Sequence, residues 1–233
     1  MPKGLHFVWF VLLLISCQRD PINPLARQDA LFFPLTTHQY SVFQVEEIRY
    51  SLLNGADTSR YQLKEVVADS FPGNGGEIIY TLRRYTRTDT TATWALDSVW
   101  TARRNEREAV VVENNVPLVK LTFPLLADES WDGNRLNSTP AQPYKLQRTG
   151  QEVRDEIDSP LDTLLIDSWT VVQQQVENLV NEDVALETYA RGVGLFYRKN
   201  VTLEYCARTE CIADRVIEAG RDYRQTLIEY GKE

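Results

Sequence analysis

Alternation of apolar and polar side chains restricts the fold of this chain more than any other feature of its sequence. Residues 193–205, VGLFYRKNVTLEY, show it most clearly. A β-strand turns successive side chains to opposite faces of a sheet, so alternation over this length predicts a strand with one buried face. Lys199 alone interrupts that apolar face. The apolar residues of the face are Val193, Leu195, Tyr197, Val201, Leu203 and Tyr205.

Similar segments recur along the chain, and glycine turns such as FPGNGGE and WDGN separate them. Many short strands with few helical patterns predict an all-β fold, built as a single antiparallel meander with at most short helices. The meander could form a barrel, a half-barrel or a sandwich, and the sequence leaves these three open. Short helices are expected at 149–159 and at 209–220, the second ending at Gly220.

The N-terminus has the pattern of a secretory signal peptide, because Lys3 precedes an apolar run over residues 7–15. This run is shorter than the ~20 apolar residues that span a bilayer, so a permanent transmembrane helix is not expected. Leu14-Ile15-Ser16-Cys17 resembles the lipobox of bacterial lipoproteins. The resemblance implies cleavage before Cys17 and acylation of its thiol and new amine, which would anchor the protein stably. The alternative is an ordinary signal peptide cut near Ser16.

Three parts are therefore predicted. Residues 1–16 form a lipoprotein signal peptide, residues 17–31 contain the lipidated Cys17 and a tether, and residues 32–233 form one β-rich domain. Two prolines and little periodicity after Cys17 are typical of a tether.

The formal net charge of −8 gives the chain no electrostatic reason to bind nucleic acid. We expect the protein at the outer membrane, held by lipid on Cys17, on a face that the sequence does not decide. An envelope protein or a glycan is the expected further partner.

Cys206 and Cys211 are the cysteines that remain once Cys17 is lipidated. An exported location permits oxidation, and the four residues between them can form a turn that brings the two Cα atoms within bridging distance. A disulfide is expected, with two buried thiols or a metal site as alternatives. Metal is disfavoured because the mature chain has no second cysteine pair and His38 as its single histidine.

The segment DESWDGN resembles the opening of a calcium loop. Oxygen ligands would come from Asp128, Ser130, Asp132 and Asn134. The loop fails at its far end, where Thr139 stands in place of a bidentate glutamate. We therefore favour a glycine turn with Trp131 in the core, and we expect no metal and no cofactor.

Catalysis is not expected. A Ser-His-Asp triad would have to use His38 together with a G-x-S-x-G nucleophile elbow, and the sequence contains no such elbow. Paired carboxylates could hydrolyse a glycosidic bond if two of them converged across a cleft. The candidates are Glu46, Glu47, Asp128, Glu129 and Asp132.

Aromatic side chains could line a ligand cavity or fill the core, and the core interpretation is favoured. The residues in question are Trp94, Trp100, Trp131, Trp169, Phe43, Tyr80, Phe123, Phe196 and Tyr197.

Several segments resemble a group of uncharacterised lipoproteins of Bacteroidota-type bacteria. The matching residues are Phe33-Pro34-Leu35, Tyr40, Tyr50, Phe123-Pro124, Trp131, Gly133-Asn134, Tyr189-Ala190 and Gly192-Val193-Gly194-Leu195. Asp128-Glu129 departs from the glycine-containing turn that is usual in this group before the tryptophan. The resemblance implies an exported, membrane-anchored β protein and brings no catalytic residue.

The predicted function is thus that of a membrane-anchored envelope lipoprotein of the non-catalytic binding or interaction type, with an unknown ligand. One alternative is a carrier of hydrophobic ligands or lipoproteins, built as a half-barrel like the LolA and LolB sorting proteins. The other is a carbohydrate-active hydrolase that uses paired carboxylates.

Overall fold

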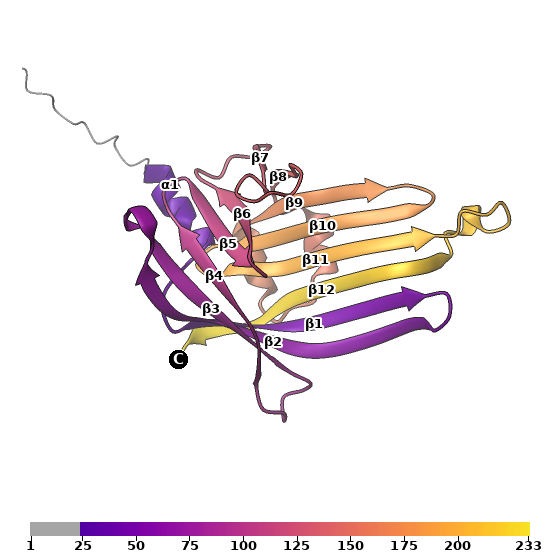
Figure 1. Ribbon diagram of the computed structural model, residues 1–233, viewed down its shortest axis with the longest axis horizontal. Coiled ribbons are helices and arrows are strands. Elements are labelled where there is room, and N and C mark those ends of the chain that lie inside the picture. Colours follow the sequence, from indigo (N-terminus) through magenta and orange to yellow (C-terminus); the bar gives the residue numbers. More distant parts are fainter. Residues whose placement is uncertain (1–23) are drawn as a thin grey trace, which may run out of the picture.

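The computed structural model describes residues 24–233, which form a twelve-stranded antiparallel sheet curled into a nearly closed barrel (Figure 1). The predicted all-β fold with only short helices is confirmed. The strands are β1 (Gln39–Ser51), β2 (Gly55–Pro72), β3 (Ile78–Arg87), β4 (Ala95–Arg104), β5 (Glu108–Glu113), β6 (Val116–Thr122), β7 (Ser130–Asp132), β8 (Pro143–Arg148), β9 (Ser168–Glu177), β10 (Asn181–Ala190), β11 (Gly194–Tyr205) and β12 (Ile217–Lys232).

The strands form two meanders, β1–β6 and β7–β12, which are joined by the pairing of β1 with β12. Strands β6 and β7 are therefore the two edges of the sheet. The edges meet where the Val119 N–H donates to the Gly133 carbonyl at 2.9 Å and the Trp131 Nε1 donates to the Val119 carbonyl at 2.9 Å. Contact between the edges makes the architecture a barrel rather than a sandwich.

The helical segments are short. They are α1 (Pro24–Asp29), η1 (Ala30–Phe32), η2 (Asn74–Gly76), α2 (Gln151–Glu156), η3 (Asp162–Asp167) and η4 (Ile212–Asp214). Helix α2 lies within the helix predicted at 149–159. The prediction for 209–220 is wrong, because only η4 is helical there and β12 follows at once.

Gly220 shows why the second helix prediction failed. This residue lies inside β12 with a φ of 130°, and a Cβ built on it would lie 2.1 Å from the Thr202 carbonyl oxygen of β11. The glycine thus permits the close approach of a neighbouring backbone, which is a recognised use of glycine within a strand. It does not cap a helix.

The chain from Pro24 to Phe32 is packed against the barrel. Ala26 is 3% exposed, the Asp29 carboxylate accepts the Leu125 N–H at 2.8 Å, and the Gly192 N–H donates to the Leu31 carbonyl at 2.9 Å. The packed part therefore begins within the segment 17–31 that we expected as a tether. The predicted signal peptide and Cys17 lie outside the described residues.

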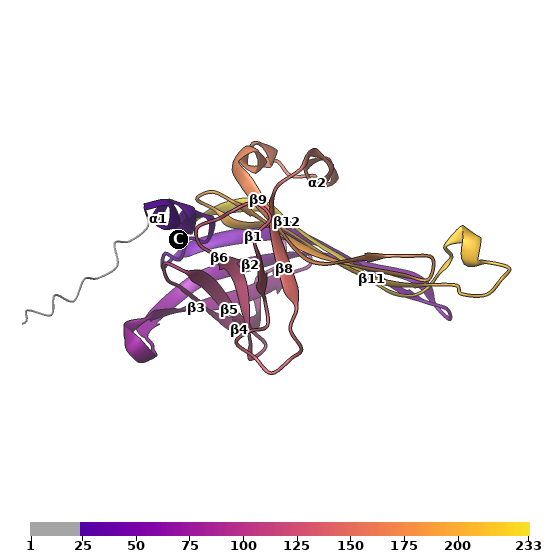
Figure 2. The same ribbon diagram turned by 90° about the horizontal axis from the view of Figure 1, so that it is seen from above.

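A second layer covers part of the outer face of the sheet, where α2 and η3 lie over the side formed by β9–β12 (Figure 2). Ile157 and Leu165 of this layer share a buried apolar cluster with Tyr197 and Val201 of β11. Lys199 Nζ donates to Glu156 Oε1 at 2.8 Å. The lysine that interrupts the apolar face of β11 is thus explained by a carboxylate of the covering layer.

Beyond the barrel, β1, β2 and β9–β12 continue as a flat extension (Figure 2). The loop between β11 and β12 lies at its tip, and it contains the disulfide Cys206–Cys211 with a Cα–Cα distance of 5.8 Å. The bond agrees with the pairing expected from the sequence.

Candidate functional site in the barrel interior

Four ionisable side chains meet on the inner face of the barrel. They are Glu113 of β5, Lys120 of β6, Glu187 of β10 and Arg198 of β11. Each lies in a β-strand, where successive side chains point to opposite faces of the sheet. Glu187 and Arg198 are directly opposite each other in the sheet, and opposed residues share a face.

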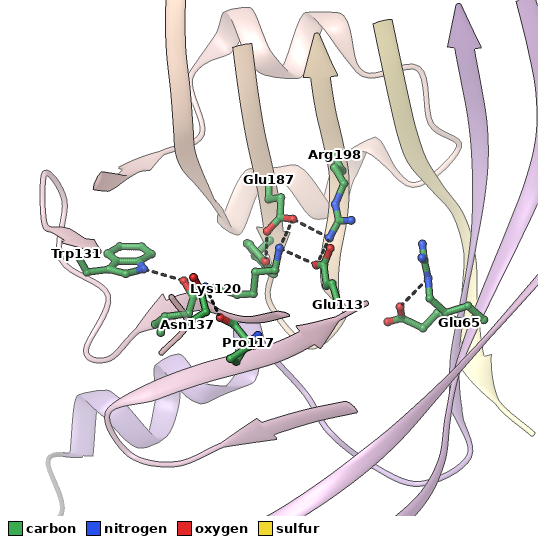
Figure 3. Close-up of polar contacts among 11 residues, drawn as sticks. Glu65, Glu113, Pro117, Lys120, Trp131, Asn137, Glu187 and Arg198 are labelled. Carbon is green, nitrogen blue, oxygen red and sulfur yellow. Dashed lines mark hydrogen bonds and ion pairs between the residues drawn. The ribbon is translucent and has the colours of Figure 1, made fainter. Parts of the chain in front are cut away.

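These four side chains form one closed network, which we call the charge layer (Figure 3). Lys120 Nζ lies 2.7 Å from Glu113 Oε1 and 2.9 Å from Glu187 Oε1. Arg198 Nη2 lies 3.0 Å from Glu113 Oε1 and 2.7 Å from Glu187 Oε1. The Tyr189 hydroxyl donates to Glu187 Oε2 at 2.6 Å. Two cations thus neutralise two carboxylates in a region where Lys120 and Glu187 are only 3% and 1% exposed.

Each ionisable group of the charge layer is kept in its charged form by neighbours of opposite charge. Burial opposes ionisation of Glu113, but Arg198 and Lys120 outweigh it and lower the pKa of this carboxyl to about 2. Burial also acts against ionised Glu187, and the same two cations lower its pKa. Burial disfavours the charge of Lys120, yet the two glutamates raise its pKa. All four groups are therefore charged at neutral pH.

Arg84 of β3 and Glu65 of β2 form a second pair on the inner face, directly opposite each other. Arg84 Nε lies 3.5 Å from Glu65 Oε2, and the guanidinium carbon lies 3.7 Å from the centroid of the Trp100 ring. Stacking of this kind stabilises a cation. Arg84 is 8% exposed, and its buried Nε has no hydrogen-bond partner among the described residues. Burial raises the pKa of the Glu65 carboxyl above its ordinary value.

Two cavities meet at the charge layer, since Glu113 and Arg198 line both. The first, mainly apolar cavity has a volume of 70 Å³ and lies against Phe33, Leu35 and Trp100. The second is polar and has a volume of 320 Å³. Its other lining residues include Tyr61, Arg84, Asp97, Asn200, Arg221 and Tyr223.

Three of the four residues that resemble calcium ligands in the sequence, Asp128, Asp132 and Asn134, have other partners. Asp128 pairs with Lys145 at 2.8 Å, and Asp132 Oδ1 accepts the backbone N–H groups of Asn134 and Gln142, both at 2.9 Å. Ser130 is exposed in β7. Over residues 24–233 the structure contains no group of three or more acidic, histidine or cysteine side chains arranged to hold a metal ion.

Trp131 lies in the core, as the sequence suggested, with 7% exposure. A Cβ on neighbouring Gly133 would lie 2.3 Å from the ring of Tyr144, so this ring requires the glycine.

Of the carboxylates that the sequence offered for catalysis, Glu46, Glu47 and Asp128 pair with cations. Asp132 accepts backbone N–H groups instead, and Glu129 has a buried Oε2 without a hydrogen-bond partner among residues 24–233. Glu46 pairs with Arg60 at 3.0 Å. Glu47 pairs with Arg49 at 2.6 Å and with Arg221 at 2.8 Å. His38 is exposed and precedes β1. The carboxylates that do converge, Glu113 and Glu187, were not among the candidates.

Most of the aromatic candidates are buried. Trp94 and Tyr80 are partly exposed, whereas Phe43 and Trp100 line the 70 Å³ cavity. The buried ones are Phe43, Trp100, Phe123, Trp131, Trp169, Phe196 and Tyr197.

Sequence reasoning missed the charge layer, although a signal for it exists. Lys120 stands in VKLTF and Glu187 in ALETYA, where each is the single charged residue within a largely apolar strand segment. An isolated charge within a buried strand requires a partner, because burial of an unpaired charge is costly. The partners come from strands distant in sequence, so only the fold identifies them.

No described helix has both the length and the apolar character that crossing a membrane would require.

No protein-family model matches the chain, and no curated protein has a similar sequence. Among solved structures, the chain is similar to a Bacteroides fragilis protein with a YmcC-like fold, which is thought to be exported. The match has a TM-score of 0.44 and 9% identity, and it covers 86% of this chain and 99% of that protein. At this level the likeness says nothing about ligand or activity.

Proposed function

We propose that the protein is a lipid-anchored cell-envelope protein of the non-catalytic binding type, which takes a small polar ligand into the 320 Å³ cavity of its barrel. The observation that carries this proposal is the composition of the inner face. Small barrels either fill their interior with side chains or hold one small ligand. Here charged and hydrogen-bonding groups line a cavity whose volume lies in the range of ligand pockets, roughly 300–1,000 Å³.

Location is supported by the sequence and by the disulfide. The lipobox-like segment ends at Cys17, and Cys206 is bonded to Cys211. Disulfides persist in oxidising compartments, which agrees with an exported chain.

The apolar cavity gives the carrier alternative little support. Its 70 Å³ is far below the volume of a typical ligand pocket, and the charge layer separates it from the polar cavity. An acyl chain would therefore have to displace buried ion pairs.

The charge layer also does not suit a hydrolase. A glycosidase needs one carboxylic acid whose pKa is raised toward the working pH, so that it can donate a proton. Glu113 and Glu187 instead have lowered pKa values, because Lys120 and Arg198 hold both in the ionised form.

Native mass spectrometry of the full chain, extracted from membranes of its expression host, tests the proposal. We expect a bound small molecule that is lost in Asn200→Trp, because this exposed residue lines the cavity and tryptophan would fill it. Thr202→Trp is the matched control, since Thr202 is exposed on the same face of β11 but does not line the cavity. A chain without adduct, or an adduct that persists in Asn200→Trp, would overturn the proposal.

A further inference from the structure

The cations around the polar cavity differ in how closely carboxylates compensate them. Arg198 contacts two carboxylates of the charge layer at 3.0 Å or less. Arg221 shares Glu47 with Arg49, so two guanidinium groups meet one carboxylate. Arg84 has Glu65 at 3.5 Å as its ion-pair partner. Positive charge is therefore least compensated at Arg84 and Arg221.

These arginines gather at one part of the cavity. The Arg221 guanidinium carbon lies 4.7 Å from the centroid of the Tyr223 ring, and Tyr223 lines the same cavity as Arg84 and Arg198. The guanidinium carbons of Arg84 and Arg198 lie 3.7 and 6.0 Å from the centroid of the Trp100 ring. Stacking on Trp100 fixes the plane of the Arg84 guanidinium. Arg84 lines the cavity, so an anion there could accept hydrogen bonds from a guanidinium whose ion-pair partner, Glu65, lies as far away as 3.5 Å.

We propose, on the basis of the proposed function, that the ligand carries a carboxylate or phosphate group, and that Arg84 and Arg221 bind this group. Planar guanidinium groups bind both anions through paired N–H donors.

The other residues that line the polar cavity indicate which class of acid would fit. Asn200 and the exposed Asp97 line the same cavity, and the Asp97 carboxylate accepts a hydrogen bond from the Ser98 hydroxyl at 2.8 Å. Glu113 also lines it but is engaged by Lys120 and Arg198. A simple anion in the cavity would be repelled by the Asp97 carboxylate. A ligand that also carries hydroxyl groups could donate hydrogen bonds to this carboxylate. The class that fits is a small hydroxylated acid, such as a sugar acid or a sugar phosphate.

Isothermal titration of the full lipidated chain in detergent tests this inference with three probes. Glucuronate carries a carboxylate, glucose 6-phosphate carries a phosphate, and glucose is neutral. We expect at least one acid to bind about tenfold or more tightly than glucose, a difference of roughly 1.4 kcal/mol. We also expect this advantage to shrink as salt is added, because salt screens charge pairs. Which acid binds distinguishes the two anion types.

Arg84→Gln should weaken binding of the acid at least about tenfold, since the glutamine retains hydrogen bonding but not charge. Arg83→Gln is the matched control, because Arg83 is the next residue of β3, is exposed, and pairs with Asp69 at 3.1 Å. Arg84→Gln leaves Glu65 without its cation, so the half-exposed Arg221→Gln serves as a second variant that should fold normally and also bind the acid more weakly.

Equal binding of glucose and both acids, no binding of either acid, or unchanged acid binding in both arginine variants would overturn the anion inference. A cavity-dependent adduct in the native mass spectrum that proves uncharged would do the same, and would leave the proposed function intact.

Discussion

Glu187 and Arg198 lie directly opposite each other on β10 and β11, and their side chains meet at 2.7 Å inside the barrel. A slip of one residue between these strands would turn one side chain outward and leave the other without its partner. The charges of the charge layer are therefore compensated only when β10 and β11 pair in this register.

Removal of Lys120 should strongly destabilise the fold. Lys120→Met leaves Glu113 and Glu187 with Arg198 as their one cation in the layer, and breaking a buried ion pair costs about 3–5 kcal/mol. Lys145→Met is the control, because its pair with Asp128 is exposed and such pairs contribute roughly 0–1 kcal/mol. Urea unfolding of both variants measures the difference. Similar midpoints for the two would contradict the role of the layer.

Acid should weaken the fold through the same carboxylates. Glu113 has a pKa of about 2 in the folded chain against an ordinary 4.5. A lowered pKa adds stability that is fully present above 4.5 and is lost as the pH falls toward 2. The free energy of unfolding should therefore decrease over this interval, and Glu187 should act in the same direction. Denaturant titrations across this pH range should give a shallower decline for Glu113→Gln, and an unchanged slope would refute the assignment.

Gly220 should tolerate no side chain. Gly220→Ala places a Cβ against the Thr202 carbonyl and forces alanine into a φ of 130°. Strain of this kind costs about 1–3 kcal/mol. Gly150→Ala is the control, since its φ is −73° and no atom lies within 4 Å of the added Cβ. Thermal unfolding compares the two, and equal midpoints would show that β11 and β12 can separate without cost.

The disulfide should contribute modestly. Replacement of Cys206 and Cys211 by serine should lower the free energy of unfolding by about 2 kcal/mol, the chain-entropy value for such a small loop. The same loss should follow reduction of the wild-type chain, whereas reductant should not affect the double variant. Free thiols at both positions in the non-reduced protein would contradict the bond.

Cys17 should carry the anchor. Palmitate labelling and globomycin-sensitive processing in cells should both be lost in Cys17→Ala, because no other residue type supports thioether acylation there. The double serine variant at Cys206 and Cys211 should keep the label, which separates lipidation from the disulfide. Undiminished labelling of Cys17→Ala would refute the lipoprotein prediction.

Alternation along the chain was enough to identify an all-β fold. In β11 the alternation placed Val201, Leu203 and Tyr205 on one face, and all three are buried. Strand period is a local property of the backbone, so it can be read from neighbouring residues. Local sequence patterns led to the wrong prediction of a helix at 209–220. Gly220 is needed there for its close contact with Thr202, and this contact comes from a segment of β11 that is not adjacent to Gly220 in the sequence.

Barrel closure and the candidate site depend on contacts between strands that are distant in the sequence. The seam depends on Val119 meeting Gly133, and the charge layer joins Glu113 and Lys120 to Glu187 and Arg198. Alternation specifies that a side chain points inward but not which strand it will face across the barrel. Charge compensation between β5–β6 and β10–β11 therefore exists only after the sheet has curled, because the curl brings distant strands within ion-pairing distance.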